Sequence, residues 1–444
     1  MARSLAPLHH RGFRLLVSGQ LASNVGDAFY AVALPWYVLA EHGGPLLLGT
    51  VLAAYGIPRT ALLAVGGNAS DRWRPWTVMM TSDAVRAAAV AALAVAAASG
   101  PARAAVLVPI AAVLGAGEGL FLPGSFSIVP ALLPDEELQS GNALASGITQ
   151  LATLAGPAIG GTLVAVLGPA PAFAIDAATF VISAASLAGV RSATRKQAVV
   201  AEPARDGAVP GTGGRAPTAW QLLRSERVLQ IVLLVTIAAN LGGAGAEEVA
   251  LPALVRGPLQ AGAGSFGGLI AAFGAGALLG TLTAGQVRRA RRPAMVGSIA
   301  FLAEALFLAI VPVAGGLVTI GAAVAACGLC NGFGNVVMIT VFQRWAPSDL
   351  LGRLTGLLML ASFGVFPISV AVGAVVVHNF GPALLFPLAA AVLVAAILAG
   401  LSQRSWRNLG ATGQPGTPAK QRRMPGNRRK PSRPITTNAA KSAS

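Results

Sequence analysis

Long apolar segments constrain the fold of this chain more than any other feature of its sequence. Each segment is a run of about 18–25 mostly apolar residues, the length that an α-helix needs to cross roughly 30 Å of hydrocarbon. Twelve such segments can be marked, at about 13–40, 46–66, 76–98, 103–127, 141–167, 170–190, 228–254, 265–285, 294–314, 317–342, 354–378 and 382–402. The sequence therefore predicts an all-α integral membrane protein with twelve transmembrane helices.

The composition agrees with this prediction. Of the 444 residues, 55% are hydrophobic and only 11% are charged, whereas a soluble domain carries about 25% charged residues. This chain has too little charge to cover a globule in water. Its 54 glycines suit helices that pack closely through small faces in lipid.

The positive charge of the chain lies mainly at one side of the predicted membrane. The net charge is +16, and ten Lys and Arg residues without any acid follow Leu401. Such a tail is expected to be disordered and to contact solvent or lipid headgroups, not nucleic acid. Arginines also precede the first span and follow the second, sixth and eighth. The positive-inside rule then predicts cytoplasmic termini in the plasma membrane.

The second half of the sequence is a diverged copy of the first. The turn Gly67–Pro75 returns as Gly285–Pro293, 218 positions later (285 − 67 = 218), and Val32–Pro35 returns as Val249–Pro252. A period this long indicates a duplicated domain, and an even number of spans in each half predicts parallel repeats. The predicted regions are an N-terminus (1–12), a six-helix half (13–190), a cytoplasmic linker (191–227), a second six-helix half (228–402) and a disordered basic tail (403–444).

Several motifs resemble one family of membrane proteins. Two parallel six-helix halves, a central linker and Gly-x-x-x-Asp-Arg after the second span resemble the major facilitator superfamily. The similarity to its branch of macrolide-type and siderophore exporters rests on Phe13–Leu16, Val32–Pro35, Leu133-Pro134 followed by Gly141–Leu144, and Phe173–Ala177. The resemblance covers about residues 12–402. It implies a secondary transporter whose substrate cavity lies between the halves and alternates between the two sides.

The resemblance also implies roles for two motifs. The loop after the second span latches the two halves together in this superfamily, which assigns a cytoplasmic latch to Gly67, Asp71, Arg72 and Arg74. A turn that merely carries inside-positive charge is the alternative. The core of the superfamily's antiporter motif, which accompanies efflux, is matched by Gly156, Pro157, Gly160 and Gly161. Packing of small residues is the alternative there.

Charged residues inside the apolar segments are candidates for function. A charge at the centre of a span costs about 2.5–3.5 kcal/mol on insertion scales, so it is rarely kept without a use. Asp27 and Glu118 lie deepest, in the first and fourth spans, and are predicted to exchange protons or contact substrate. Asp83 and Arg86 share a helix face and are predicted to form a structural pair. Further charges within the segments, away from their first residues, are Arg59, Asp176, Glu247, Glu248 and Glu304.

No motif for catalysis, metal binding or nucleotide binding is present, so we expect neither an enzyme nor a cofactor. The predicted function is export of a small amphipathic drug or natural product by proton antiport. The protein is expected to be a monomer in the lipid bilayer. Importing or facilitating a polar metabolite is one alternative, and a non-transporting sensor or scaffold is another. The predicted cavity lining includes Asn24, Gln150, Asn240, Phe121 and Phe333.

Overall fold

The structure, a computed structural model, describes residues 2–40, 43–72, 75–198, 223, 226–284, 292–346, 351–407 and 409–410. Within these ranges the chain is helical and contains no strand. The long helices of the N-terminal half are α1 (Arg11–Ala40), α2 (Gly44–Arg72), α3 (Pro75–Ser99), α4 (Ala104–Ile128), α5 (Leu138–Leu167) and α6 (Pro169–Ala198).

The C-terminal half has the same pattern with one irregular helix. Its elements are α8 (Arg227–Gly245), the π-turn η4 (Ala246–Ala250), α9 (Leu251–Arg256), α10 (Ala263–Ala284), α11 (Pro293–Ile310), α12 (Leu317–Trp345), α13 (Leu351–Phe380) and α14 (Pro382–Ser402). Five short helices complete the described chain: η1 (Ala2–His9), η2 (Val129–Ala131), η3 (Asp135–Glu137), η6 (Val311–Val313) and α15 (Arg404–Arg407).

The helices have the length and composition of membrane spans. Eleven helical segments in the described ranges are long and apolar enough to cross a bilayer, and each corresponds to one predicted segment from the second onward. The first predicted segment is α1, which has 30 residues and packs between α5 and α6 in the same bundle. Gln20, Asn24 and Asp27 make α1 more polar than its neighbours. The predicted all-α membrane fold is confirmed.

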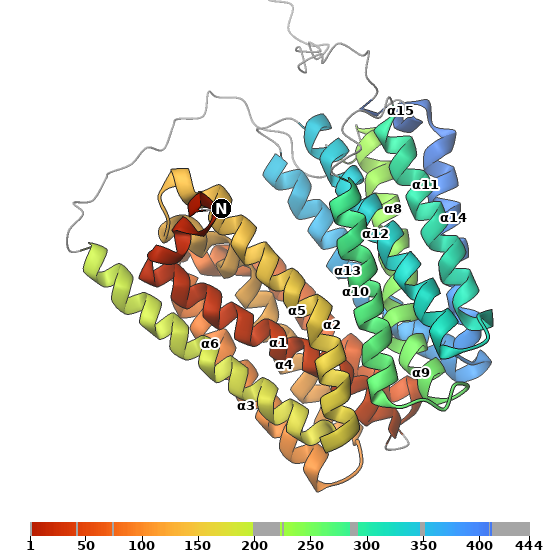
Figure 1. The fold of residues 1–444 in the computed structure, drawn as a ribbon, viewed down its shortest axis with the longest axis horizontal. Coiled ribbons are helices and arrows are strands. Elements are labelled where there is room, and N and C mark those ends of the chain that lie inside the picture. Colours follow the sequence, from red (N-terminus) through yellow and green to blue (C-terminus); the bar gives the residue numbers. More distant parts are fainter. Residues whose placement is uncertain are drawn as a thin grey trace, which may run out of the picture.

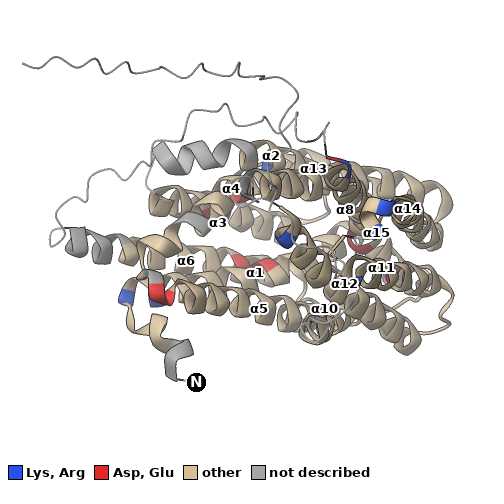
Figure 2. Ribbon diagram, turned by 90° about the horizontal axis from the view of Figure 1, so that it is seen from above, with Lys and Arg blue, Asp and Glu red and all other residues tan. Residues whose placement is uncertain are grey.

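The two halves form separate bundles that meet at one end (Figure 1). We call the end that carries η1 and α15 the terminal end, and the end that carries α9 the far end. The ribbons of the halves converge at the far end and diverge toward the terminal end (Figure 1). Across the halves, α2 packs against α13 and α5 packs against α10. Charged residues are few along the helices (Figure 2).

The sequence duplication has a counterpart in helix packing. In the N-terminal half, Gly115 and Gly119 of α4 press against the carbonyl oxygens of Tyr55 and Arg59 of α2. In the C-terminal half, Gly328 and Gly332 of α12 press against the carbonyl oxygens of Phe273 and Ala277 of α10. A methyl group at any of these glycines would collide with the facing backbone. The halves therefore repeat the same glycine-dependent helix contact in the same register.

The start of the basic tail is part of the folded C-terminal half, which corrects the predicted boundary at residue 403. The side chain of Trp406 in α15 is only 1% exposed, and Leu409 is 8% exposed. Trp406 Nε1 donates a hydrogen bond to Ser298 Oγ of α11 over 3.0 Å. A tryptophan and a leucine among basic residues mark this short anchor in the sequence. Residues 411–444 lie outside the described part of the chain.

Replacing Trp406 with alanine is expected to lower the free energy of unfolding by about 3–5 kcal/mol, the usual cost of deleting a buried aromatic ring. Truncation after Gln403 should have a similar effect, whereas truncation after Gly410 should have little. Thermal unfolding in detergent, followed by fluorescence, measures both. Arg404→Ala, at an exposed neighbour, is the control. Equal melting temperatures for the two truncated chains would mean that α15 does not anchor the bundle.

Candidate transport site

An arginine-centred cluster joins α1, α3 and α6 in the N-terminal half. Arg86 of α3 donates a hydrogen bond from Nη2 to Asp27 Oδ1 of α1 over 2.8 Å, and its Nη1 lies 3.8 Å from Asp83 Oδ1. The guanidinium also lies 4.0 Å from the ring centre of Phe180. The predicted pair of Asp83 and Arg86 is therefore present, and Asp27 has a cationic partner on another helix.

A third carboxyl group, that of Asp176 in α6, belongs to this cluster. Asp176 is 1% exposed and Asp83 is fully buried, whereas 43% of the Asp27 side chain is accessible. Thr179 Oγ1 donates to Asp176 Oδ1 over 3.4 Å, but no described residue donates to its Oδ2. Gly26 lets α1 approach this site, because a methyl group there would collide with Asp176 and Thr179. One guanidinium thus lies within 4 Å of two carboxyl groups, Asp27 and Asp83. Of the three carboxyl groups of the cluster, Asp27 is the accessible one.

A second ion pair lies where the two halves meet. Arg59 Nη2 of α2 lies 2.8 Å from Glu118 Oε1 of α4. The same guanidinium lies 4.4 Å from the ring centre of Phe363, which belongs to α13 of the other half. Next to it, Thr60 Oγ1 donates to the Phe363 carbonyl oxygen over 3.0 Å. Arg59 therefore contacts Glu118 in its own half and Phe363 in the other half.

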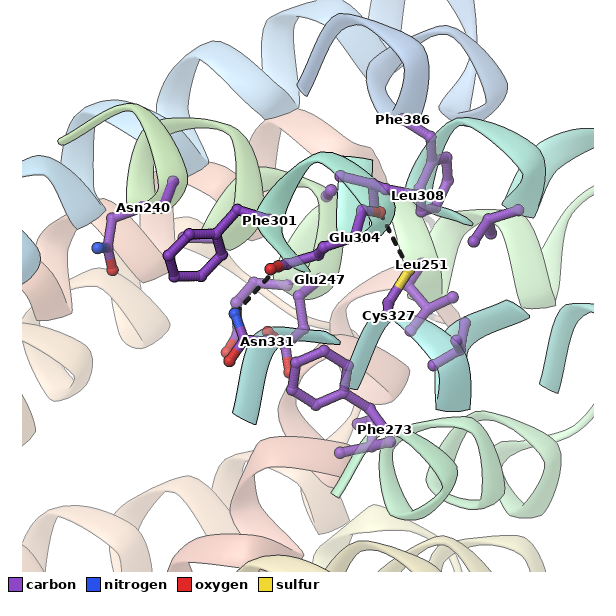
Figure 3. Close-up of a pocket in the computed structure, with 18 of the residues that line it drawn as sticks. Asn240, Glu247, Leu251, Phe273, Phe301, Glu304, Leu308, Cys327, Asn331 and Phe386 are labelled. Carbon is purple, nitrogen blue, oxygen red and sulfur yellow. Dashed lines mark hydrogen bonds between the residues drawn. The ribbon is translucent and has the colours of Figure 1, made fainter. Parts of the chain in front are cut away.

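A cavity of about 490 Å³ lies within the C-terminal half (Figure 3). This volume is in the range of pockets that hold drug-sized molecules. Its polar lining includes Glu304 of α11, whose Oε1 accepts a hydrogen bond from Asn331 Nδ2 of α12 over 3.0 Å. The other residues that matter to its chemistry are Asn240, Glu247, Glu248, Phe273, Phe301, Asn335, Phe366 and Phe386.

A more apolar cavity of about 420 Å³ adjoins the first. The two share Asn240, Phe301 and Asn335. The second cavity is also lined by Gln343, Trp406 and Leu409. Gln343 lies near the end of α12, Trp406 lies in α15, and Leu409 lies in the turn that follows. Together the cavities extend from the polar groups around Glu304 toward the terminal end.

The glycines of the predicted antiporter motif form a junction between three helices. Gly156, Pro157, Gly160 and Gly161 are all buried in α5. A methyl group on Gly160 would lie 3.0 Å from Phe29 Cα of α1, and one on Gly161 would lie 2.9 Å from Gly267 Cα of α10. The motif thus lets α5 pack closely against α1 of its own half and against α10 of the other half.

Replacing Gly161 with valine is expected to separate α5 from α10 at the far end, because the α10 backbone cannot yield as a flexible side chain can. Overpacking of this kind costs about 1–3 kcal/mol. We expect increased labelling of single cysteines introduced near the far ends of these helices. Gly268→Val is the matched control, since a side chain at Gly268 meets nothing within 4 Å. Identical labelling of the two variants would show that this contact does not hold the far end closed.

The remaining predicted residues are distributed over both halves. Asn24 Nδ2 donates to Thr149 Oγ1 over 3.3 Å, Gln150 is exposed, and Phe121 packs beside Arg86. Asn240 lines both cavities, whereas Phe333 packs against a neighbouring apolar cluster. In the latch, Gly67, Asp71 and Arg72 lie in a part of α2 whose side chains are not described, and Arg74 is outside the described residues.

The sequence prediction missed the partners of the two deep carboxyl groups and the importance of Glu304. Arg86 and Arg59 lie on different helices from Asp27 and Glu118, so spacing within one helix does not reveal the pairs. The duplication could have pointed to Glu304, because its position in the second half is equivalent to that of Arg86 in the first. Glu304 lies 11 residues after Pro293, which opens α11, as Arg86 lies 11 residues after Pro75, which opens α3.

Comparison with known proteins agrees with this architecture. The profile of a family described as "Transmembrane secretion effector" matches residues 2–405. The multidrug efflux pump Tap of Mycobacterium tuberculosis is 28% identical, over 80% of this chain and 84% of that protein. The enterobactin exporter EntS of Salmonella paratyphi A is 27% identical, over 78% and 81%.

Solved structures show the same fold at lower identity. A bacterial homologue of the iron transporter ferroportin, crystallised in an inward-facing state, superposes with a TM-score of 0.68 at 15% identity, covering 89% of this chain and 98% of the other. The family match spans nearly the whole folded region and coincides with the two six-helix bundles. The chain belongs to the major facilitator superfamily, in its family of transmembrane secretion effectors.

Proposed function

We propose that this multi-pass membrane protein exports a small amphipathic compound from the cell in exchange for protons. The observation that carries the proposal is the pair of adjoining cavities, which share lining residues and extend from the buried carboxyl group of Glu304 toward Trp406 of α15. A substrate cavity that reaches toward one end of the bundle is expected of a transporter in one of its alternating states. Two relatives named as exporters support export over import.

The opening faces the cytoplasm in this proposal. The helices η1 and α15 lie at the terminal end (Figure 1), and the positive-inside rule predicts that the arginine-rich N-terminal segment is cytoplasmic. At the far end, Arg256 Nη2 donates to the Ala40 carbonyl oxygen over 3.3 Å, and its guanidinium lies 5.3 Å from the Trp36 ring centre. These contacts join α9 to α1 and close the outer side. Rocking the halves exchanges this closure for one at the terminal end, where the latch around Asp71 would act.

The proton enters through the arginine-centred cluster. Asp27 and Asp83 lie within 4 Å of Arg86, Asp176 is buried on the adjoining helix α6, and α2 and α4 carry a second ion pair between Arg59 and Glu118. Two cations face four carboxyl groups, so the cluster carries surplus negative charge unless it binds protons. Asp27 is the accessible member and is therefore the proposed entry point. Releasing Arg86 from Asp27 loosens α1 from α3, which links protonation to helix movement.

Accumulation of chemically varied amphipathic compounds in a susceptible host tests this function. Cells producing the chain should accumulate less of at least one compound, and a protonophore should restore accumulation to the level of cells without the chain. A reduction that survives collapse of the proton gradient would exclude proton antiport. Equal accumulation with and without the chain across the whole panel would count against export.

A further inference from the structure

The duplicated halves differ in charge at equivalent positions. Arg86 and Glu304 occupy the same place in α3 and α11, 11 residues after the opening proline. The position of Arg59, whose carbonyl oxygen faces Gly119, is taken in the second half by Ala277, which faces Gly332. Arg86 and Arg59, the two arginines that pair with deep carboxyl groups in the N-terminal half, therefore have no cationic counterpart at the equivalent positions of the C-terminal half.

The carboxyl groups remain where these cations are missing. Glu247, Glu248 and Glu304 line the 490 Å³ cavity, and no Lys or Arg is among the described residues that line it. The guanidinium of Arg59 lies across the junction between the halves and is paired with Glu118. Glu304 Oε1 accepts from Asn331, while Oε2 is buried and accepts from no described residue.

The backbone and the aromatic lining point to the same ligand chemistry. Glu247 and Glu248 lie in the π-turn η4, an irregularity that is frequent at functional sites because it changes the direction of side chains. Glu304, Glu247 and Asn331 lie together between the rings of Phe301 and Phe273 (Figure 3). Aromatic faces beside carboxylates bind organic cations through cation–π attraction as well as charge. A neutral ligand would leave these carboxylates without a cation among the described residues that line the cavity.

We infer that this cavity binds amphipathic organic cations, in which an ammonium or other onium group is joined to apolar rings. The cationic group lies between Glu304 and Glu247, in the place where the first half holds its own guanidinium. Phe273, Phe301, Phe366 and Phe386 contact the apolar part. The inference names the substrate class for the proposed export, so its biological role rests on that function, although binding itself does not.

Binding of two probes of nearly equal shape tests the inference. Tetraphenylphosphonium is a lipophilic cation, and triphenylphosphine oxide is a neutral analogue of similar apolar surface. Calorimetry on the purified full-length chain in detergent, without any gradient, should give tighter binding of the cation. Glu304→Gln is expected to weaken cation binding about tenfold or more, which corresponds to about 1.4 kcal/mol, and to leave the neutral probe within about twofold. Glu247→Gln should act in the same direction.

Two controls keep the outcome decisive. Glu226→Gln removes an exposed carboxyl at the start of α8 and should leave both affinities unchanged. The melting temperature of each variant establishes that it is folded. Equal loss of both probes in Glu304→Gln, or failure of the wild-type chain to prefer the cation, would overturn the inference. Protonophore-sensitive export of neutral compounds would still stand in that case, whereas cation binding without any export would reject the proposed function alone.

Discussion

Replacing Arg86 with methionine lowers the free energy of unfolding by about 3–5 kcal/mol at neutral pH, the expected cost of removing one partner from a buried ion pair. Arg86 is 6% exposed and is the only described cation within 4 Å of Asp27 or Asp83. Without it, two carboxyl groups face Asp176 across an apolar interior. Methionine fills the volume of the stem and keeps contact with Phe180, so the loss reflects charge more than packing.

Thermal unfolding of Arg86→Met in detergent measures this effect. Adding Asp83→Asn to the variant should recover part of the loss, because it removes the most deeply buried carboxylate. The cost should also shrink as the pH falls, since protonated carboxyl groups need no cation. Arg103→Met, at an exposed arginine, is the control. A pH-independent loss that Asp83→Asn does not relieve would point to packing as the cause.

Gradient-driven export should fall about tenfold or more in Asp27→Asn, a change of about 1.4 kcal/mol or more in the driven step, while the protein remains folded. The amide oxygen of asparagine still accepts a hydrogen bond from Arg86, and Asp83 lies 3.8 Å from the same guanidinium. The variant therefore keeps the helix contact but cannot take up the proton. Exchange of substrate across the membrane without a gradient should continue.

Proteoliposomes with an imposed pH gradient separate these two activities. The wild-type chain and Asp27→Asn are compared for gradient-driven transport and for exchange at equal pH on both sides. Glu226→Gln again serves as a folded control with one carboxylate fewer. Full gradient-driven transport by Asp27→Asn would exclude Asp27 as the proton carrier and leave Glu118, paired with Arg59, as the next candidate.

The spans could be predicted from the sequence because bilayer thickness fixes the length of an apolar helix. Eleven of the twelve predicted segments are both long enough and apolar enough to span a bilayer. The twelfth, α1, is long enough but more polar, and it still packs in the bundle. The end of the folded region was harder to predict. Trp406 is one apolar residue among basic ones, and its docking on Ser298 depends on a helix 108 positions away in the sequence.

The candidate site was only partly accessible to sequence analysis. Asp27 and Glu118 stand out as single charges in apolar segments, but their arginine partners are set by how α1 meets α3 and how α2 meets α4. Periodicity reports which residues share one helix face and carries no information on the neighbouring helix. The cavity around Glu304 required the register of the two repeats, which becomes certain only when Gly119 and Gly332 are seen in equivalent contacts.

The unequal charges of the duplicated halves affect how such a protein can evolve. The ion pairs that we propose to govern proton uptake lie in one of the duplicated halves, and the residues that line the cavity lie in the other. If the proposed roles hold, we expect mutations at Phe301, Asn335 or Phe386 to alter the range of compounds accepted and to leave the ion pairs of the other half intact. Selection by a new toxic compound would then change residues of the C-terminal half, which lines the cavity. The ion pairs of the N-terminal half would stay unchanged.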